Sequence, residues 1–276
     1  MTDSTAYLPP ELAAGITVVP LTVAMGGIEG DEGDEVTPAE VAAALAARRV
    51  PVTTSRPSPE RLARCYRAAL ANGAAGVVSV HLSAKLSATY EGAVLAAAEV
   101  DPERIAVVDA RSTGMGLGFA ALAAAAAAAA GGDLSAVAAA AKAAAARTET
   151  FFYVDTLEFL RRGGRISAAS ALVGTALSVK PILHVRDGEI AVRDRVRTTS
   201  RALDRLVDLA VSAAGDGEVD IAVHHFVAEE RARALTEALL KRLGPRVRRH
   251  WVSEVGAVVA AHAGPGLAGV VVHRCA

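Results

Sequence analysis

Residues 52–58 read VTTSRPS and place four hydroxyl side chains, one arginine and one proline in seven positions. Ser58 has a structural explanation, because a hydroxyl followed by proline and glutamate is typical of a helix start, here a helix over 58–72. The residues before Pro57 keep no capping role and can donate hydrogen bonds to a ligand. Taken alone, a hydroxylated turn of this kind is better explained by ordinary loop chemistry.

A second group of hydroxyls lies in LSAKLSATYEGA, residues 82–93, directly after the apolar run 76–83. Ser83, Ser87 and Thr89 fall where a strand turns into a helix. In parallel α/β sheets, ligands gather at the carboxyl ends of strands, beside the free N–H groups of helix starts. The sequence therefore predicts that these hydroxyls lie at a ligand site.

Two segments of the second half add charge and glycine. RRGGRIS sets Arg165 behind a Gly-Gly turn, and AHAGPG sets His262 before a proline flanked by glycines. Considered singly, RRGGRIS is better explained as a basic surface turn, and AHAGPG as a loop that contains a histidine. With the hydroxyl groups they form a set of Thr, Ser, Arg and His side chains, which suits a carboxylate better than a reaction centre.

The elements that must position these residues alternate in type. The apolar runs 16–24, 76–83 and 104–110 read as strands, and helical stretches are predicted at 38–49, 58–72, 87–98 and 114–130. Strands that alternate with helices indicate a parallel sheet covered on both faces, an α/β fold.

After residue 150 the pattern changes to strands, with FFYVDTLEFL among them and a hairpin predicted across Asp187-Gly188. We expect a mixed sheet there. The predicted division is an N-terminal α/β domain over 1–148 and a C-terminal α/β domain over 149–276.

Composition excludes several classes of protein. The chain has 276 residues, of which 52% are hydrophobic, and a net charge of −1, which argues against nucleic acid as a partner. Two cysteines cannot build a disulfide framework, so a reducing cytoplasm is expected, and no basic region followed by an apolar run marks a signal peptide. The uncharged stretch 114–132 is rich in alanine, which is only weakly hydrophobic, and predicts a packed interior helix.

Common enzyme motifs are missing from the sequence. The segment 112–118, STGMGLG, fails the dinucleotide pattern because Phe119 stands at the third glycine position. There is no P-loop, no G-x-S-x-G elbow, no H-E-x-x-H and no paired-cysteine zinc spacing. We therefore expect no metal, no cofactor and no catalytic residue of its own.

Eight segments resemble, in order along the whole chain, the successive signatures of the DegV family of bacterial proteins. They are TDSTAYLP at the start, VVPL at 18–21, TTSRPSPE at 53–60, LSAKLSATYEGA at 82–93, LEFLRRGGRIS at 157–167, LSVKPIL at 177–183, DGEIAVRDRVRT at 187–198 and AHAGPG at 261–266. The resemblance implies a three-layer α/β/α domain with a parallel sheet, followed by a two-layer domain with a mixed sheet, and a ligand between the two.

The resemblance also implies a function. The family is known for binding fatty acids, and several members carry the lipid for a fatty acid kinase, which converts the bound carboxylate to an acyl phosphate. The carboxylate-binding hydroxyls of the family fall on Thr54 and Ser87, and its polar residues near the head group on Arg165 and His262. Arg197 matches a position implicated in engagement of the kinase. Partners would be a long-chain fatty acid and the kinase subunit, with transient contact to a membrane surface.

The chain departs from the family pattern at two residue positions and at its start. Arg56 replaces a glutamine and adds positive charge near the site, and Ala88 replaces a glycine. Family members also have an apolar strand directly before TDST, whereas this chain starts at Met1. Two explanations stay open: the first strand is missing, or the given start of the sequence lies too late. An unpaired sheet position would lower stability.

Two further functions stay open at this point. A phosphotransferase or kinase-like enzyme, related to dihydroxyacetone kinase domains, would need nucleotide or phosphohistidine chemistry. A purely structural or regulatory protein would leave the hydroxyl cluster empty. A lipid carrier, in contrast, would gain about 0.8 kcal/mol per buried CH₂ from the acyl chain and would use the polar residues to orient the head group.

Overall fold

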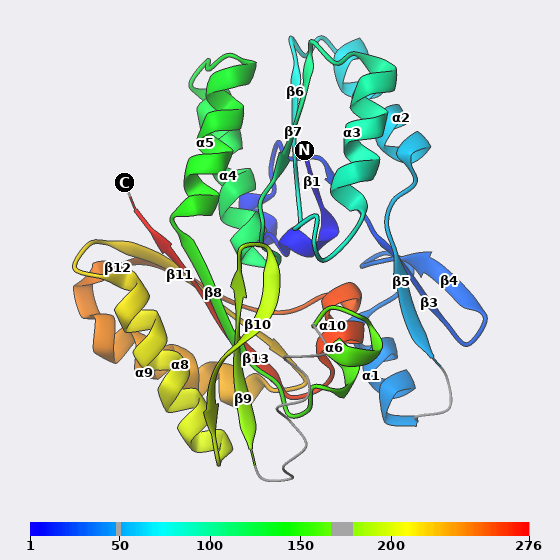
Figure 1. Cartoon of the computed structure of the whole chain (residues 1–276). Helices are drawn as coiled ribbons and strands as arrows, with labels where there is room; N and C mark the ends of the chain where they lie inside the picture. Colours follow the sequence, from blue (N-terminus) through cyan, green and yellow to red (C-terminus); the bar gives the residue numbers. More distant parts are fainter. Residues whose placement is uncertain (48–50, 167–178, 276) are drawn as a thin grey trace.

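The computed structural model describes residues 1–47, 51–166 and 179–275 and contains three β-sheets (Figure 1). Sheet A has the strand order β2-β1-β6-β7, and its strands all run parallel. Their bounds are Thr2–Asp3 for β1, Val18–Val19 for β2, Val77–His81 for β6 and Ile105–Asp109 for β7.

Helices cover both faces of sheet A, as predicted. On β7, Ile105 packs with α2 and α3, whereas Val108 faces α4 and α5, because successive side chains of a strand point to opposite faces. The helices are α2 (Pro59–Ala71), α3 (Thr89–Val100), α4 (Met115–Ala129) and α5 (Leu134–Ala146). Figure 1 shows the two pairs on either side of the sheet. This part is the expected three-layer α/β/α unit.

A strand of two residues, β1, occupies the position in sheet A where a gap was expected. Thr2 pairs with Val18 on one side and with Val80 on the other, so β1 lies inside the sheet. The ammonium group of Met1 donates a hydrogen bond to the carbonyl of Val78 at 2.8 Å. The predicted gap is therefore partly filled: β1 occupies the position between β2 and β6, but only Thr2 pairs with β6, a strand of five residues.

Residues 16–24, predicted as one strand, belong to two sheets. Pro20 interrupts them, since proline cannot donate a ladder hydrogen bond. After it, β3 (Thr22–Met25) starts the antiparallel sheet B, with the order β4-β3-β5. Its other strands are β4 (Ile28–Asp31) and β5 (Val52–Ser55), and helix α1 (Pro38–Ala47) lies between them in the chain.

The hydroxyl cluster is a strand and not a loop. Val52, Thr53 and Thr54 are β-branched, which suits the extended backbone, and Thr54 pairs with Val23. The alternation of a strand points Thr53 outward and leaves Thr54 half-buried. Ser58 caps α2 as predicted, because its hydroxyl accepts from the N–H of Arg61 at 3.1 Å.

Sheet D is the mixed sheet expected in the second half, with the order β10-β9-β8-β13-β11-β12. Only β11 and β12 run parallel, and the other neighbours are antiparallel. The strands are β8 (Thr148–Tyr153), β9 (Lys180–Arg186), β10 (Glu189–Val196), β11 (Val219–Phe226), β12 (Val247–Glu254) and β13 (Leu267–Arg274). Helices α8 (Thr199–Ala214) and α9 (Glu229–Leu243) cover one face of it.

Two local predictions in this half had different outcomes. The hairpin at Asp187-Gly188 is confirmed, with φ of 53° and 84°, as a two-residue turn of the primed type requires. The segment FFYVDTLEFL is only partly a strand, because β8 ends at Tyr153 and helix α6 (Glu158–Arg162) follows. Positions 48–49 of the helix expected at 38–49, Ser167 of RRGGRIS and 177–178 of LSVKPIL lie outside the described residues.

The alanine-rich stretch after residue 114 forms α4, whose first seven residues are all buried. The N-terminal turn of α4 packs Met115 and Phe119 on Ala222 and Val271 of sheet D. No described helix combines the length and the apolar character needed to cross a membrane.

The second face of sheet D shares a core with sheet B. Val23 and Val41 from the first half pack in one cluster with Phe152, Leu183 and Val258 from the second half. Val258 belongs to helix α10 (Ala257–Ala263), which lies beside α1 and α6. The chain segment 22–47 therefore shares a core with the second half, and the domain division near residue 148 stays a prediction.

Candidate pocket for an acyl ligand

A cavity of about 440 Å³ lies where the carboxyl end of sheet A meets the second face of sheet D. Most of its wall is aliphatic or aromatic, and it includes Leu82, Leu86, Phe152, Val185, Val258 and Val271. The wall comes from sheet D, from α10, from β5 and from the loops after β6 and β7. An apolar cavity with a few polar groups is the usual form of a small-molecule site.

All four residues predicted to contact the head group line this one cavity: Thr54, Ser87, Arg165 and His262. Thr54 and His262 are 208 positions apart in the chain, and Thr54 Oγ1 lies 2.7 Å from His262 Nε2, a hydrogen bond. The fold thus brings the hydroxyl cluster and the AHAGPG segment into direct contact.

His262 lies in the last turn of α10 and not in a loop. Burial, and then the nearby positive charge of Arg165, lower the pKa of the imidazole to about 4, so it is neutral near pH 7. The ring packs against Gly163, where any Cβ would overlap with it. The first glycine of RRGGRIS therefore makes room for the histidine, not for a ligand.

Arg165 reaches across the pocket to the loop that follows β6. Its Nε donates to the carbonyl of Leu86 at 3.0 Å, and its Nη1 donates to the carbonyl of Gly163. Burial lowers the pKa of this guanidinium from its ordinary value, which is high enough that the group stays charged. No carboxylate among the described residues pairs with Arg165, so its charge is available to an anion.

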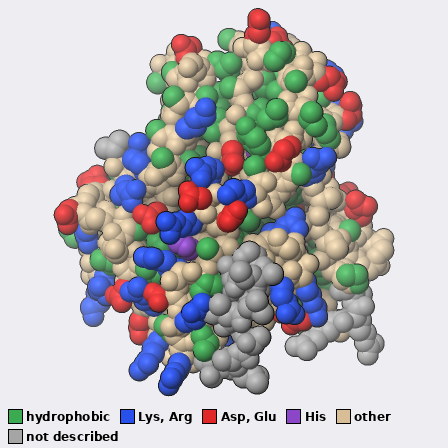
Figure 2. All heavy atoms as spheres, viewed as in Figure 1, with side chains coloured by type: hydrophobic (Ala, Val, Ile, Leu, Met, Phe, Trp, Pro, Cys, Tyr) green, Lys and Arg blue, Asp and Glu red, His purple; other side chains and the backbone are tan. Residues whose placement is uncertain are grey.

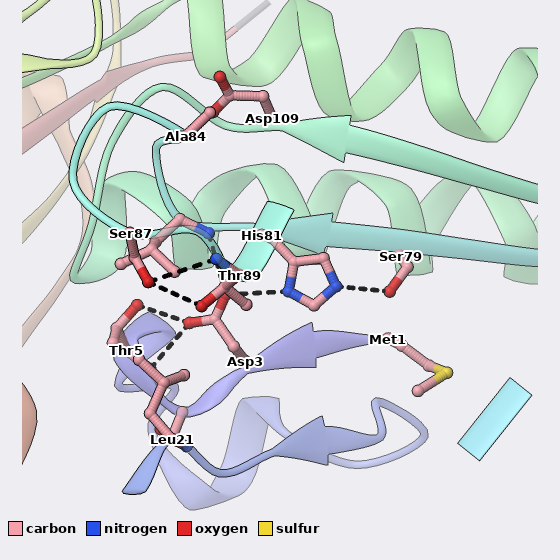
Figure 3. Close-up of polar contacts among 12 residues, drawn as sticks. Met1, Asp3, Thr5, Leu21, Ser79, His81, Ala84, Ser87, Thr89 and Asp109 are labelled. Atoms are coloured by element: carbon pink, nitrogen blue, oxygen red, sulfur yellow. Dashed lines mark hydrogen bonds and ion pairs between the residues drawn. The ribbon is translucent and has the colours of Figure 1, made fainter. Parts of the chain in front are cut away.

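The hydroxyls after β6 have three different roles. Ser87 lines the cavity, and its Oγ lies 2.9 Å from Oγ1 of the buried Thr89. Ser83 is buried and donates to the carbonyl of Gly188 at 2.7 Å, which ties this loop to the β9–β10 hairpin. Of these three hydroxyls, Ser87 is the one that lines the cavity, and Thr89 lies within hydrogen-bond distance of it (Figure 3).

Asp3 lies in a buried hydrogen-bond network that no sequence pattern indicated. Its carboxylate accepts from Thr5 N, Thr5 Oγ1 and His81 Nδ1 at 3.1, 2.6 and 3.0 Å, and from Leu82 N at 2.9 Å (Figure 3). His81 Nε2 in turn lies 2.8 Å from Ser79 Oγ.

The Ser79–His81–Asp3 contacts resemble the triad of a hydrolase, but they do not form a hydrolytic centre. Ser79, His81 and Asp3 are each fully buried, so no substrate reaches the hydroxyl. The network instead joins β1 to β6 and holds the backbone at Leu82, where the loop toward Ser87 begins.

Two further polar groups near the cavity have no motif around them in the sequence. His224 lines the wall, accepts from Met115 N at 3.0 Å, and has its pKa lowered to about 4 by burial. Glu32, whose pKa is raised by burial, accepts from Tyr7 Oη at 3.0 Å and from Val258 N at 2.8 Å. This second contact anchors the start of α10, which carries His262.

Arg197 does not line the cavity. It is exposed just after β10 ends at Val196, seven positions along the chain from the pocket residue Ile190. Figure 2 shows many Lys and Arg side chains on the viewed face over sheet D and mainly uncharged side chains over the upper part of sheet A. Within the described ranges no cluster of three or more His, Cys, Asp or Glu side chains is close enough to hold a metal ion.

Comparison with known proteins gives a match along nearly the whole chain. A sequence model described as an uncharacterised protein of the DegV family matches residues 1–274. The chain belongs to the DegV family. A DegV domain-containing protein of Streptomyces coelicolor is 53% identical over 274 residues, which cover 99% of this chain and 96% of the relative.

Solved DegV structures share the fold. The DegV family protein of Thermus thermophilus, described as binding a fatty acid, has a TM-score of 0.92 and 37% identity, over 99% of this chain and 98% of its own. DegV of Bacillus subtilis, described as a fatty acid binding protein, has a TM-score of 0.88 and 31% identity over 99% and 98%. The α/β fold class and the family predicted from the DegV signatures are thereby confirmed.

Proposed function

We propose that this DegV protein binds a long-chain fatty acid in the 440 Å³ cavity, with the carboxylate held by Thr54, Ser87, Arg165 and His262. The observation that supports this most is the convergence of these four residues on one mainly apolar cavity. The two hydroxyls and the guanidinium can donate to carboxylate oxygens, and the neutral imidazole orients the hydroxyl of Thr54.

The acyl chain supplies most of the affinity in this proposal. Each CH₂ moved from water to the apolar wall contributes about 0.8 kcal/mol. The polar residues then fix which end of the ligand lies beside Ser87 and Thr54. DegV proteins of similar sequence that are described as binding fatty acids support the same ligand class.

The proposed role of the bound lipid is to be phosphorylated by a partner kinase. A carboxylate oxygen attacks the γ-phosphorus of ATP, a new P–O bond forms, and the bond to the ADP oxygen breaks, so that an acyl phosphate and ADP result. The partner supplies the nucleotide site, because the chain has no phosphate-cradling motif. The protein itself is then a carrier without catalysis, it contacts membranes only transiently, and it acts in the cytoplasm, where ATP is available.

The alternative function is a kinase-like enzyme related to dihydroxyacetone kinase domains. Such an enzyme would turn over ATP without a partner. ATP hydrolysis by the isolated chain would favour this function over the carrier, provided that further purification leaves the activity unchanged and a pocket substitution abolishes it.

Protein purified from cells should carry a fatty acid. Organic extraction of the folded protein followed by mass analysis is expected to yield an acyl chain in near-equal molar amount. Absence of any acyl chain, combined with failure to bind added palmitate or oleate, would contradict the proposal.

Thr54→Ala and Ser87→Ala should each weaken fatty acid binding. Each change removes a hydrogen bond to a charged group, which contributes about 1.5–3 kcal/mol, and so the dissociation constant should rise by roughly 10- to 150-fold. Thr53→Ala is the matched control, because Thr53 is the exposed neighbour on β5 and does not line the cavity. Equal affinity of all three variants and the unchanged protein would place the carboxylate elsewhere.

A further inference from the structure

Two arginines lie on either side of Ser87. Arg165 Nε donates to the carbonyl of Leu86 at 3.0 Å, and Arg56 Nη1 donates to the carbonyl of Ala88 at 3.1 Å. These carbonyls belong to the residues directly before and after Ser87. Both arginines line the cavity, one from the strand-to-helix connection after β5 and the other from the turn after α6.

The charges of these arginines are not balanced by the protein. In the described ranges neither Arg56 nor Arg165 lies within ion-pair distance of a carboxylate, whereas Arg61, five residues after Arg56, is paired with Asp31 at 2.6 Å. Among the residues that the structure describes, no Asp or Glu lines the cavity. The two histidines in its wall, His224 and His262, are held neutral by burial, which lowers both pKa values to about 4.

The head-group end of the cavity therefore carries two positive charges, but a fatty acid carboxylate brings only one negative charge. A phosphate monoester carries about −1.5 to −2 at neutral pH and offers three acceptor oxygens. Guanidinium groups match such oxygens through parallel N–H donors. A dianionic head group thus fits the charge of the site better than a carboxylate.

We infer that Arg56 and Arg165 form a clamp around Ser87 that retains a phosphorylated acyl head group more tightly than the free carboxylate, and that Arg56 supplies the preference. The inference rests on the proposed function, since the acyl phosphate is the product of that reaction. Arg165 also donates a hydrogen bond to the carbonyl of Gly163 and lies beside His262, so its loss should weaken the binding of both ligands. Arg56 makes a single hydrogen bond to the described part of the protein and has an exposed side chain, so its charge can be removed selectively.

The test compares two ligands with the same C16 tail, palmitate and hexadecyl phosphate, at pH about 8, where the phosphate is mainly dianionic. Arg56→Gln should raise the dissociation constant of hexadecyl phosphate about tenfold or more and that of palmitate about threefold or less. Arg64→Gln on α2 is the matched control, because it removes the same charge from an exposed arginine outside the cavity. Arg56→Lys keeps the charge but not the parallel N–H donors, so it should keep part of the preference.

Salt provides a second readout. Because the clamp is open to solvent at Arg56, the preference for hexadecyl phosphate should shrink when the ionic strength rises from about 0.05 to 0.5 M, and Arg56→Gln should make the preference nearly independent of salt. Equal losses for both ligands in Arg56→Gln, or the same loss in Arg64→Gln, would overturn the clamp while leaving fatty acid binding intact.

The variants also separate the clamp from a structural role of Arg56. If Arg56→Lys behaves like Arg56→Gln while both unfold at the same urea concentration as the unchanged protein, positive charge at this position is not what selects the phosphate, and the inference fails. If the unchanged protein binds neither C16 ligand, the proposed function itself fails, and this result is distinct from all the others.

Discussion

Arg197→Ala should leave the fatty acid affinity within about twofold of the unchanged protein while it lowers acyl-phosphate formation by the partner kinase about tenfold or more. The reason is its location. Arg197 is exposed beyond the end of β10, does not line the cavity, and follows seven positions after the pocket residue Ile190. A strand rises about 3.3 Å per residue, so up to about 23 Å of chain separates Arg197 from the cavity residue Ile190. We therefore expect a charge in this exposed position to act on a partner and not on the head group.

The measurement is paired. Palmitate affinity and the initial rate of acyl-phosphate production are determined for each variant at fixed kinase, ATP and salt concentrations. Arg233→Ala on α9 serves as the control, because Arg233 is also an exposed arginine. Its helix covers the face of sheet D that points away from the cavity. Parallel loss of binding and turnover in Arg197→Ala would refute the assignment of Arg197 to the partner surface.

Asp3→Ala should lower the free energy of unfolding by about 3 kcal/mol or more. The carboxylate of Asp3 is fully buried and accepts four hydrogen bonds, from two groups of Thr5 and from His81 and Leu82. Removing it leaves buried donors without partners, and each such donor costs about 1–3 kcal/mol. Urea unfolding followed by circular dichroism measures the loss.

Asp3→Asn and Asp34→Ala make this result specific. Asparagine keeps the shape but turns one acceptor oxygen into a donor, so it should cost less than alanine and still destabilise. Asp34 is exposed in the first half of the chain, and its removal should change stability by about 0.5 kcal/mol or less. An Asp3→Ala protein that unfolds at the same urea concentration as the Asp34→Ala protein would contradict the network.

The elements that sequence reasoning identified correctly have strong local signals. Ser58 caps α2, and the Ser-Pro-Glu pattern is typical of such a helix start. The turn needs positive φ at two positions, and Asp187 and Gly188 both tolerate it. The strand β5 was missed because its hydroxyl residues are typical of loops. It is stabilised by pairing with β3, and no local sequence pattern indicates this sheet. Tertiary pairing decided its state.

The candidate site divides in the same way. Thr54, Ser87, Arg165 and His262 stood out because polar residues and glycines interrupt apolar runs, and the fold does bring them to one cavity. Asp3 and His81 were not recognised as partners, since only a long-range contact between β1 and β6 joins them. Whether the four cavity residues hold a carboxylate stays a prediction until the affinity of their variants is measured.

The sharing of one core by sheets B and D has a consequence for the rate of ligand exchange. The chain passes between sheet A and the layer of sheets B and D three times, after Val19, after Ser55 and after Ala146. Three covalent connections tether the two parts, so a hinge opening would have to bend all three at the same time. We therefore expect a guest in the cavity to leave by sliding along its own axis, and every further carbon lengthens the path and adds apolar surface to re-wet. Residence time should therefore increase steeply with ligand length, so that a long chain stays bound long enough to be handed on while a short one is lost.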